Sequence, residues 1–492
     1  MALLAGVDVG TTGTKVALVD PGSGVVAEAA LPATLHSPAA GHAEADPQQW
    51  WDNVCRLFPT VIASAGVTPR DIAAVATSGM VPAVVATDRI GRPVRRAILQ
   101  NDARAVDELG EMAKEVAQLD LVSLTGSPLS QQSVGPTLRW LARHEPSQWR
   151  ATSTVLGSYD WLLVTLGAET HVELNWSIES GLYDLSGRTL PEVVESCDCG
   201  ERLPPVARTG TVVGEVSADA AAATGLRAGT PLVVGGADHV LSVVGAGLHE
   251  PGDVLIKLGG AGDIMVVTDR IVTDPRLYLD SYPIPGRWMP NGCMATSGSL
   301  LRWVQTLVGG ADLATLDSEA ETSPPGELLC LPYFLGEKTP LNDPDLRGAF
   351  VGLHLGHGRG SLHRAALEAI AFGFRHHLEV FAELGFTPRR AWVTNGGSHS
   401  TTWKRIVANV IGLPLVPVLD HPGASLGAAL AAGIALREID SWSAAFKSVR
   451  YGETIEFDAA LHDHYNDRYR LWRELGDAMI TTSHELATRS RA

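Results

Sequence analysis

Short apolar runs alternate along this chain with longer stretches whose apolar residues recur every three or four positions. The runs are rich in Val, Ile, Leu and Ala and are bounded by turn residues, as buried strands are. They predict strands over residues 3–9, 72–77, 231–237, 328–331 and 391–394. The longer stretches predict helices over residues 47–62, 103–116, 361–384, 399–411 and 424–436, with Ser361 as the N-cap of the third. Strands and helices in alternation are typical of the α/β class, which we therefore expect.

The hairpin that opens the chain has a counterpart near its middle. The first residues read as strand, glycine–threonine turn and strand, and residues 253–267 (D-V-L-I-K-L-G-G-A-G-D-I-M-V-V) repeat this pattern. When the two are superposed, Gly10 falls on Gly259 and Gly13 on Gly262. Such a repeat indicates a duplicated domain, and the segment before the second hairpin is rich in glycine, as boundaries are. We therefore predict domains of residues 1–244 and 245–492.

Composition restricts the class of protein. With 492 residues, the chain is too long for a single core. Hydrophobic residues make up 45% and charged residues 19%, which is the balance of a folded globular protein. Acidic residues outnumber basic ones by 55 to 38, and the resulting net charge of -17 disfavours nucleic acid as a partner.

The chain also lacks the features of exported and membrane proteins. Its five cysteines are scattered and odd in number, which argues against a disulfide framework. The apolar N-terminus has no basic segment of the kind that opens a signal peptide, and no uncharged run is long enough to span a membrane. We therefore expect a cytoplasmic protein with no membrane partner.

The segment D-V-G-T-T-G-T-K, Asp8 to Lys15, has the composition of a phosphate-binding turn. Its two glycines permit a tight reversal with exposed N–H groups, Thr11 and Thr12 add hydroxyl donors, and Lys15 adds a positive charge. These groups can hold the phosphates of a nucleotide, while Asp8 can hold Mg²⁺ directly or through water. A plain hairpin turn explains the glycines and threonines equally well. Neither a Walker A sequence nor G-x-G-x-x-G occurs in the chain.

A second motif, G-G-A-D-H at 235–239, follows a predicted strand directly. A carboxylate at the carboxyl end of a buried strand lies where open α/β sheets bind their ligands. Phosphoryl transfer needs a base for the attacking hydroxyl, and Asp238 suits that role. A helix N-cap is the competing interpretation of Asp238.

Two further glycine pairs follow predicted strands, in Gly259–Gly262 and in T-N-G-G-S-H-S at 394–400. Paired glycines allow the backbone to approach a phosphate or a flat ring closely, but they are also ordinary strand-to-helix connections. The small-residue run 424–433 predicts close helix packing. The chain has sixteen histidines, and those near the predicted helix 361–384 show no carboxylate partner at metal-ligand spacing, so we do not expect a metal site there.

The order of several longer motifs resembles that of the FGGY family of carbohydrate kinases, and the resemblance covers nearly the whole chain. The motifs are D-V-G-T-T-G-T-K (8–15), A-E-A-D-P-Q-Q-W-W (43–51), I-L-Q-N-D-A-R (98–104), G-G-A-D (235–238), S-G-S-L-L-R-W (297–303), L-P-Y-F-L-G-E-K-T-P (331–340), N-D-P-D-L-R-G-A-F-V-G-L (342–353) and R-A-A-L-E (364–368).

This resemblance implies two domains of the actin, hexokinase and Hsp70 ATPase type, which is a ribonuclease H-like α/β fold, with the active site in the cleft between them. It implies that ATP and Mg²⁺ are used to phosphorylate a hydroxyl of a small sugar or polyol. It makes Asp238 the catalytic base and Asp8 a magnesium-side residue. The nucleotide would contact Thr11, Thr12, Lys15, Gly259, Gly260, Gly298, Gly396 and Gly397, and the sugar would contact Met80, Asn101, Asp102 and Asp238.

Some positions depart from the family pattern. Val81 and Gln100 stand where xylulokinase-like members carry a histidine and an aromatic residue, which disfavours D-xylulose itself as the substrate. Gly260 and Ala261 stand where the second phosphate loop usually carries Thr and Ser, and Lys257 stands where a small polar residue is common. Each lost hydroxyl bond costs about 0.5–1.5 kcal/mol, which weakens a site without abolishing it.

These departures motivate an alternative function: a catalytically weakened kinase-fold protein that binds nucleotide or sugar as a regulator. The presence of Asp8, Lys15 and Asp238 together favours the active kinase. The sequence leaves the oligomeric state open, a homodimer included.

Overall fold

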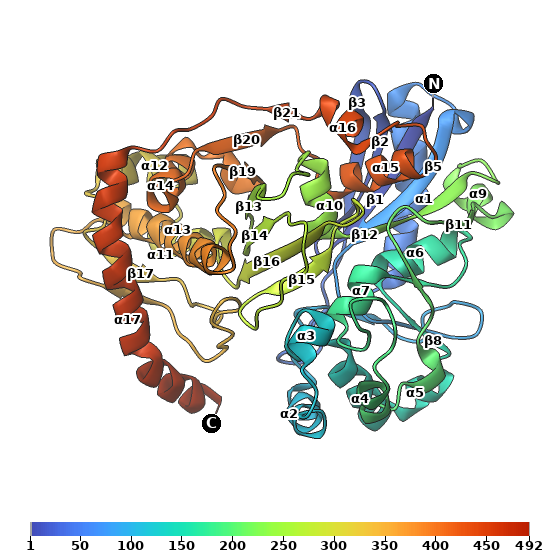
Figure 1. The fold of residues 1–492 in the computed structure, drawn as a ribbon, viewed down its shortest axis with the longest axis horizontal. Helices are drawn as coiled ribbons and strands as arrows, with labels where there is room; N and C mark the ends of the chain where they lie inside the picture. Colours follow the sequence, from blue (N-terminus) through green and yellow to red (C-terminus); the bar gives the residue numbers. More distant parts are fainter. Residues whose placement is uncertain (1, 492) are drawn as a thin grey trace.

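The structure is a computed structural model that describes residues 2–491, and Figure 1 shows two α/β bodies side by side. The first body contains a six-stranded sheet in the order β11-β12-β5-β1-β2-β3. Its strands are β1 (Leu3–Gly10), β2 (Gly13–Asp20), β3 (Gly24–Pro32), β5 (Ile72–Gly79), β11 (Val212–Glu215) and β12 (Pro231–Ala237). Since β1 is parallel to β5 and β5 is parallel to β12, these three strands end at the same edge.

The second body contains a seven-stranded sheet in the order β15-β16-β14-β13-β19-β20-β21. Its strands are β13 (Val254–Leu258), β14 (Gly262–Val266), β15 (Tyr278–Ser281), β16 (Trp288–Met294), β19 (Ala391–Thr394), β20 (Leu415–Leu419) and β21 (Arg450–Tyr451). The antiparallel hairpin β13–β14 lies beside the parallel strand β19, as β1–β2 lies beside β5. The two predicted hairpins therefore occupy equivalent places in the two sheets.

Helices cover both sheets. Against the first sheet pack α1 (Pro47–Ala65), α6 (Ser158–Leu166), α10 (Asp238–Gly245) and α15 (Ala424–Ala435), and the second body is built around α11 (Gly298–Leu307), α12 (Leu313–Thr322), α13 (Arg359–Glu383), α14 (Thr401–Ile411) and α17 (Ala459–Arg491). The other α-helices are α2 (Val106–Glu115), α3 (Leu121–Thr125), α4 (Val134–His144), α5 (Pro146–Ala151), α7 (Leu174–Glu179), α8 (Pro191–Ser196), α9 (Ala218–Thr224) and α16 (Trp442–Ala445). No helix among residues 2–491 is both long and apolar enough to cross a membrane.

The predicted strands 231–237 and 391–394 form with these limits as β12 and β19. The prediction for the helix 361–384 was wrong at its start, because α13 begins at Arg359 with Gly358 as its N-cap. The amide of Ser361 already donates to the carbonyl of Gly358 over 3.1 Å, so Ser361 lies inside the first turn. A serine N-cap is a local signal, and here the extended backbone of Gly358 sets the start of the helix.

Helix α15 crosses back from the second body to pack on the first sheet and on α10, which confirms the close packing predicted for its small residues. A Cβ on Gly427 would lie 2.0 Å from the carbonyl oxygen of Leu241, and one on Gly6 would lie 1.8 Å from that of Ser425. Both obstacles are backbone atoms. The division of the chain at residue 244 stays a prediction, while the segment after residue 424 contributes to the core of the first body.

We expect Gly427→Ala to destabilise the fold by about 1–3 kcal/mol, because an added methyl group must push two helix backbones apart. Thermal and urea unfolding measure this change. The matched control is Gly110→Ala in α2, where an added Cβ meets nothing within 4 Å and helix propensity favours alanine. Equal stability of the two variants would contradict the packing argument.

Glu337 is a carboxyl buried beside β16, where its Oε1 accepts the amides of Ala295 (2.7 Å) and Lys338 (2.9 Å). Burial raises the pKa of Glu337 to about 8 from an ordinary 4.5. Between pH 4.5 and 8 the folded state thus holds a proton that the unfolded state has lost, so this group lowers stability as the pH rises through that window.

Glu337→Gln keeps the accepting oxygen and removes the charge. We expect the variant to be more stable than the parent at pH 9, by on the order of 1–2 kcal/mol after local relaxation, and equally stable at pH 5. Urea unfolding at the two pH values tests this. A difference that does not grow with pH would show that Glu337 titrates normally.

Candidate active site

The register of the first sheet brings three predicted site residues to one edge. Val9 pairs with Gly79, and Gly79 pairs with Ala237, so the ends of β1, β5 and β12 form a row. Asp8 precedes the end of β1, and Met80 and Asp238 directly follow β5 and β12. Parallel strands that end together place the residues at and after their ends around one crevice.

Asp8 and Asp238 lie close enough to affect each other's ionisation. The Oδ1 atom of Asp8 is buried and has no hydrogen-bond partner among the described residues. Burial, and after it the negative charge of Asp238, raise the pKa of Asp8 to about 7, while Lys15 and Lys257 act in the opposite direction. A buried carboxylate oxygen without a donor fits a cation.

Asp238 is the first residue of α10, and the N-cap is Ala237, so the N-cap interpretation of Asp238 is wrong. Burial by itself raises the pKa of Asp238, but the neighbouring His239 and the charge of Lys257 outweigh it, and the pKa lies below its usual value. Its side chain is 36% exposed. An ionised, accessible carboxylate can accept a proton.

The turn between β1 and β2 presents the predicted phosphate-binding residues. Thr11 is half-buried and Thr12 is exposed, and the carbonyl of Thr12 accepts the amide of Ala33 over 3.0 Å. The Nζ atom of Lys15 donates to the carbonyl of Pro422 over 3.0 Å, just before α15. This hydrogen bond fixes the ammonium group of Lys15, whose positive charge acts on Asp8.

The predicted glycines of the second half meet around the end of β13. The amide of Gly298 donates to the carbonyl of Gly259 (2.8 Å), and a Cβ on Gly298 would lie 2.7 Å from that oxygen. A Cβ on Gly397 would lie 2.6 Å from the Cβ of Leu258. Gly260 and Gly396 are exposed, and a Cβ on either would meet nothing within 4 Å. The result is an open backbone surface that a flat ring or a phosphate can approach.

Lys257 belongs to the second sheet, and its charge interacts with those of Asp8 and Asp238 in the first half. From the sequence it was recognisable only as an unusual residue for its position. It lies on β13 with its Nζ 3.5 Å from the Oδ2 of Asp263 on β14. Burial disfavours its charge, but Asp263, Asp238 and Asp8 together raise the pKa of Lys257 above its usual value. The signal available in the sequence was a lysine within an otherwise apolar strand, two residues before the glycine turn.

The predicted sugar contacts divide into two groups. Met80 is buried at the end of β5, where its amide donates to the carbonyl of Val9 over 3.0 Å. Asn101 and Asp102 lie in the loop after the short strand β7 (Ala97–Ile98). Asn101 is exposed, whereas both oxygens of Asp102 are taken by the amide of Ala43 and by Arg104. Among the described residues, no hydrogen bond or ion pair joins Asn101 or Asp102 to Asp8 or Asp238.

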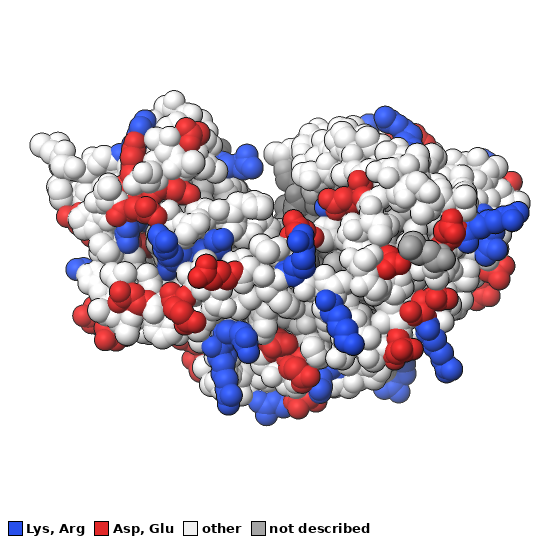
Figure 2. Space-filling view, turned by 90° about the horizontal axis from the view of Figure 1, so that it is seen from above, with Lys and Arg blue, Asp and Glu red and all other residues white. Residues whose placement is uncertain are grey.

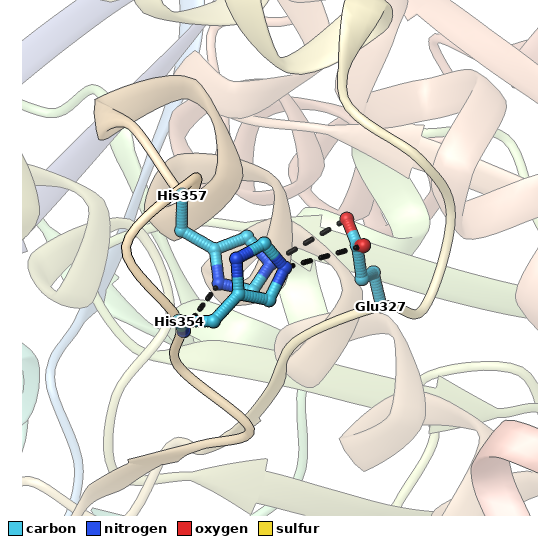
Figure 3. Close-up of side chains that lie close together, drawn as sticks. All are labelled: Glu327, His354 and His357. Atoms are coloured by element: carbon cyan, nitrogen blue, oxygen red, sulfur yellow. Dashed lines mark hydrogen bonds and ion pairs between the residues drawn. The ribbon is translucent and has the colours of Figure 1, made fainter.

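Two histidines just before α13 contact a carboxylate from another segment of the chain. Figure 3 shows His354 and His357 with their Nε2 atoms directed at Glu327, 3.6 and 3.4 Å from its two oxygens. The partner comes from a segment 27 residues earlier in the chain than His354, since Glu327 lies before the short strand β17 (Leu329–Leu331). Spacing along the sequence cannot show such a contact.

This cluster is nevertheless poorly suited to a metal ion. The Nδ1 atom of His354 accepts the amide of Gly356, and that of His357 accepts the amide of His354, each over 3.1 Å. The proton of each neutral ring is therefore on Nε2, where it faces Glu327. A ligating Nε2 must be free of its proton, and its ring usually donates from Nδ1. We interpret the cluster as a clamp between two loops.

The surface seen from above in Figure 2 is hollowed between the two halves of the molecule, with acidic and basic side chains at the edge of the hollow. The charges on this face are mixed, and no large basic area is present on it, which agrees with the net charge of -17. The site described above draws on both halves of the molecule. Asp8 lies near the end of one strand of the first sheet and Asp238 directly follows another, whereas Lys257 lies on the second sheet.

Comparisons with known proteins agree with this arrangement. The family models for the N-terminal and C-terminal domains of the FGGY family of carbohydrate kinases match residues 3–245 and 256–436. Xylulose kinase of Escherichia coli K12 is 28% identical over 482 residues, covering 96% of this chain and 99% of that protein. Autoinducer-2 kinase of Escherichia coli ATCC 8739 is 30% identical over 473 residues, covering 91% and 89%.

Among solved structures, xylulose kinase from Rhodospirillum rubrum superposes with a TM-score of 0.90 at 41% identity, covering 98% of this chain and all of that one. The two family models match in their natural order, and together they cover most of the chain. The chain belongs to the FGGY family of carbohydrate kinases.

Proposed function

We propose that this carbohydrate kinase transfers the terminal phosphoryl group of ATP to a hydroxyl of a small sugar or polyol, with Asp238 as the general base. The observation that supports this most directly is the ionised carboxylate of Asp238 just after β12, close enough to Asp8 and Lys257 for their charges to interact. The relatives described above that are named xylulose kinase favour an acceptor of pentulose size.

Residues from both halves fit a magnesium nucleotide. The open backbone at Gly260 and Gly396 suits the nucleotide, with Gly259, Gly298 and Gly397 holding the surrounding turns. Thr11, Thr12 and Lys15 would face its phosphates. Asp8, with its unpaired buried oxygen, would hold Mg²⁺ directly or through water. When bound, magnesium ATP supplies the phosphoryl group and part of the positive charge that stabilises its transfer.

On the sugar side, we assign different roles to the two polar residues of the loop after β7. Arg104 and the amide of Ala43 already occupy the carboxylate of Asp102, so Asp102 fixes the loop. Asn101, which is exposed, then makes the hydrogen bond to the substrate. Met80 contributes an apolar wall beside the base.

The side chains of this protein then contribute a base and two cations to the transfer. Asp238 accepts the proton of the attacking hydroxyl, and Lys15 and Lys257 offset the negative charge on the two sides of the transfer path. Approach of the two bodies would exclude water, so that the acceptor is the sugar. A homodimer and a division at residue 244 remain predictions that this mechanism does not require.

The test is an ADP-release assay over pentuloses, tetritols, glycerol and aldonates, with the phosphorylated product identified by mass spectrometry. We expect release that depends on one class of acceptor and on Mg²⁺. The alternative, a regulator with weakened catalysis, predicts sugar or nucleotide binding by calorimetry without any phosphorylated product. That second outcome across the whole panel would overturn the proposal.

A further inference from the structure

A second cluster of charged side chains lies beside Asp238. It consists of Glu179 at the end of α7, His239 on α10 and Asp280 on β15, and one nitrogen or oxygen atom from each side chain lies within 4.8 Å of the other two. None of the three entered the sequence-based site. His239 directly follows the predicted base, which is the only local signal for it.

The ring of His239 lies between two carboxylates. Its Nε2 is 2.7 Å from the Oδ2 of Asp280, and its Nδ1 is 3.6 Å from the Oδ1 of Asp238. Glu179 approaches the same Nε2 at 3.9 Å. Each ring nitrogen thus has a carboxylate oxygen near it, and only the protonated ring carries a proton on both nitrogens.

Asp280 is almost fully enclosed, with 1% of its side chain exposed. Its Oδ2 accepts hydrogen bonds from the side-chain Nδ2 of Asn291 (2.7 Å) and from His239, while its Oδ1 has no partner among the described residues. A buried carboxylate without a cation is costly, and His239 is the cation that contacts this one. Asp280 and Asp238 outweigh burial and raise the pKa of His239 well above its usual value.

Glu179 is not a second anionic partner of His239. Burial and the neighbouring Asp280 raise the pKa of Glu179 well above its usual value, so it is a neutral carboxyl beside the pair. A metal ion would need the Nε2 of His239 without its proton, but the 2.7 Å contact with Asp280 is a hydrogen bond that uses this proton. The cluster is therefore an ion pair with a neutral neighbour.

The contact also links the two bodies of the molecule. His239 belongs to α10, which follows the first sheet, whereas Asp280 lies on an edge strand of the second sheet. The side chain of Asn175 on α7 fixes the next residue of that strand, accepting the amide of Ser281 (2.7 Å) and donating to its carbonyl (3.0 Å). The position of Asp280 against His239 is thus set by the packing of β15 on α7.

We propose that His239, held as an imidazolium by Asp280, is a positioning residue that orients Asp238 and keeps it ionised for proton abstraction. This rests on the proposed role of Asp238 as the base. Since Asp280 comes from the other sheet, the base is fully prepared only where β15 is packed against α7 and α10.

The experiment compares His239→Gln, Asp280→Asn and the double variant with the parent enzyme, using the pH dependence of kcat/KM for the best acceptor. We expect each single variant to lose about tenfold to a hundredfold in kcat, with the sugar KM changed less than about threefold. The acidic limb of the profile should move to higher pH by about one unit or more, because a cation near Asp238 is lost. The double variant should be no worse than His239→Gln, since both changes remove one network.

His249→Gln, which alters a half-exposed histidine outside this cluster, is the matched control and should leave the profile unchanged. An unmoved acidic limb in both single variants would overturn the inference. If His239→Gln fails to fold, histidine-labelled NMR of the parent decides, because a ring that is neutral at pH 7 contradicts the proposal.

Asp238→Asn separates this inference from the proposed function. If that variant is inactive while His239→Gln and Asp280→Asn keep the pH profile of the parent, Asp238 is the base but His239 does not position it. If Asp238→Asn retains near-normal turnover, the proposed function itself fails.

Discussion

Asp238→Asn is expected to lower kcat by about 10²–10⁴-fold, the usual contribution of a positioned general base. The amide has nearly the shape of the carboxylate but cannot accept the hydroxyl proton. Asp238 makes no capping hydrogen bond to α10, so the substitution leaves the start of that helix intact. Steady-state kinetics with the best acceptor measure the loss, and calorimetry should show that the sugar still binds.

The control is Asp219→Asn, which also alters an acidic residue in the first turn of a helix, α9, but on the exposed surface. It should leave kcat unchanged. Asp238→Asn has a second expected effect: it removes the negative charge that helps to raise the pKa of Asp8, so that pKa should fall. Near-normal turnover of Asp238→Asn would show that another group takes the proton.

Lys257→Met is expected to lower kcat by about 10–10³-fold and to raise the KM for ATP. This lysine lies on the second sheet, and its positive charge acts on both Asp8 and Asp238. Such cations stabilise the charge that develops on a transferring phosphoryl group. Methionine keeps much of the length of the side chain without its charge. Kinetics at saturating and limiting ATP separate the two effects.

Loss of Lys257 also leaves Asp263 without its ion-pair partner, which costs stability by itself. The double variant Lys257→Met/Asp263→Asn removes both charges and should recover most of the melting temperature. It should not recover kcat. If the double variant turned over at nearly the parent rate, Lys257 would serve only to balance Asp263.

The altered second phosphate loop has a physical explanation if Lys257 acts in this way. Gly260 and Ala261 offer no side-chain hydroxyl, but the backbone around Gly260 is open, and a lysine two residues before the turn adds charge. A cation acts over a longer distance than a hydroxyl donor does. The alternative of a weakened regulator, which the sequence left open, therefore loses part of its motivation.

Features that depend on neighbouring residues could be predicted from the amino-acid sequence. Apolar runs between turn residues located β12 and β19, and the repeated hairpin located β1–β2 and β13–β14, because strand periodicity and turn chemistry are local. Long motifs in a fixed order indicated the FGGY family. Asp8 and Asp238 were visible as carboxylates at or just after the ends of strands.

Which of these residues lie close together depends on contacts between distant segments of the chain. Parallel pairing of β1, β5 and β12 joins segments far apart in sequence and sets the row that contains Asp8 and Asp238. The pair of His239 with Asp280 spans 41 residues, and the contact of Glu327 with His357 spans two loops, so neither has a spacing that periodicity can detect. The pKa of Asp8 could not be predicted from the sequence either, because it depends on burial and on charges from distant segments of the chain.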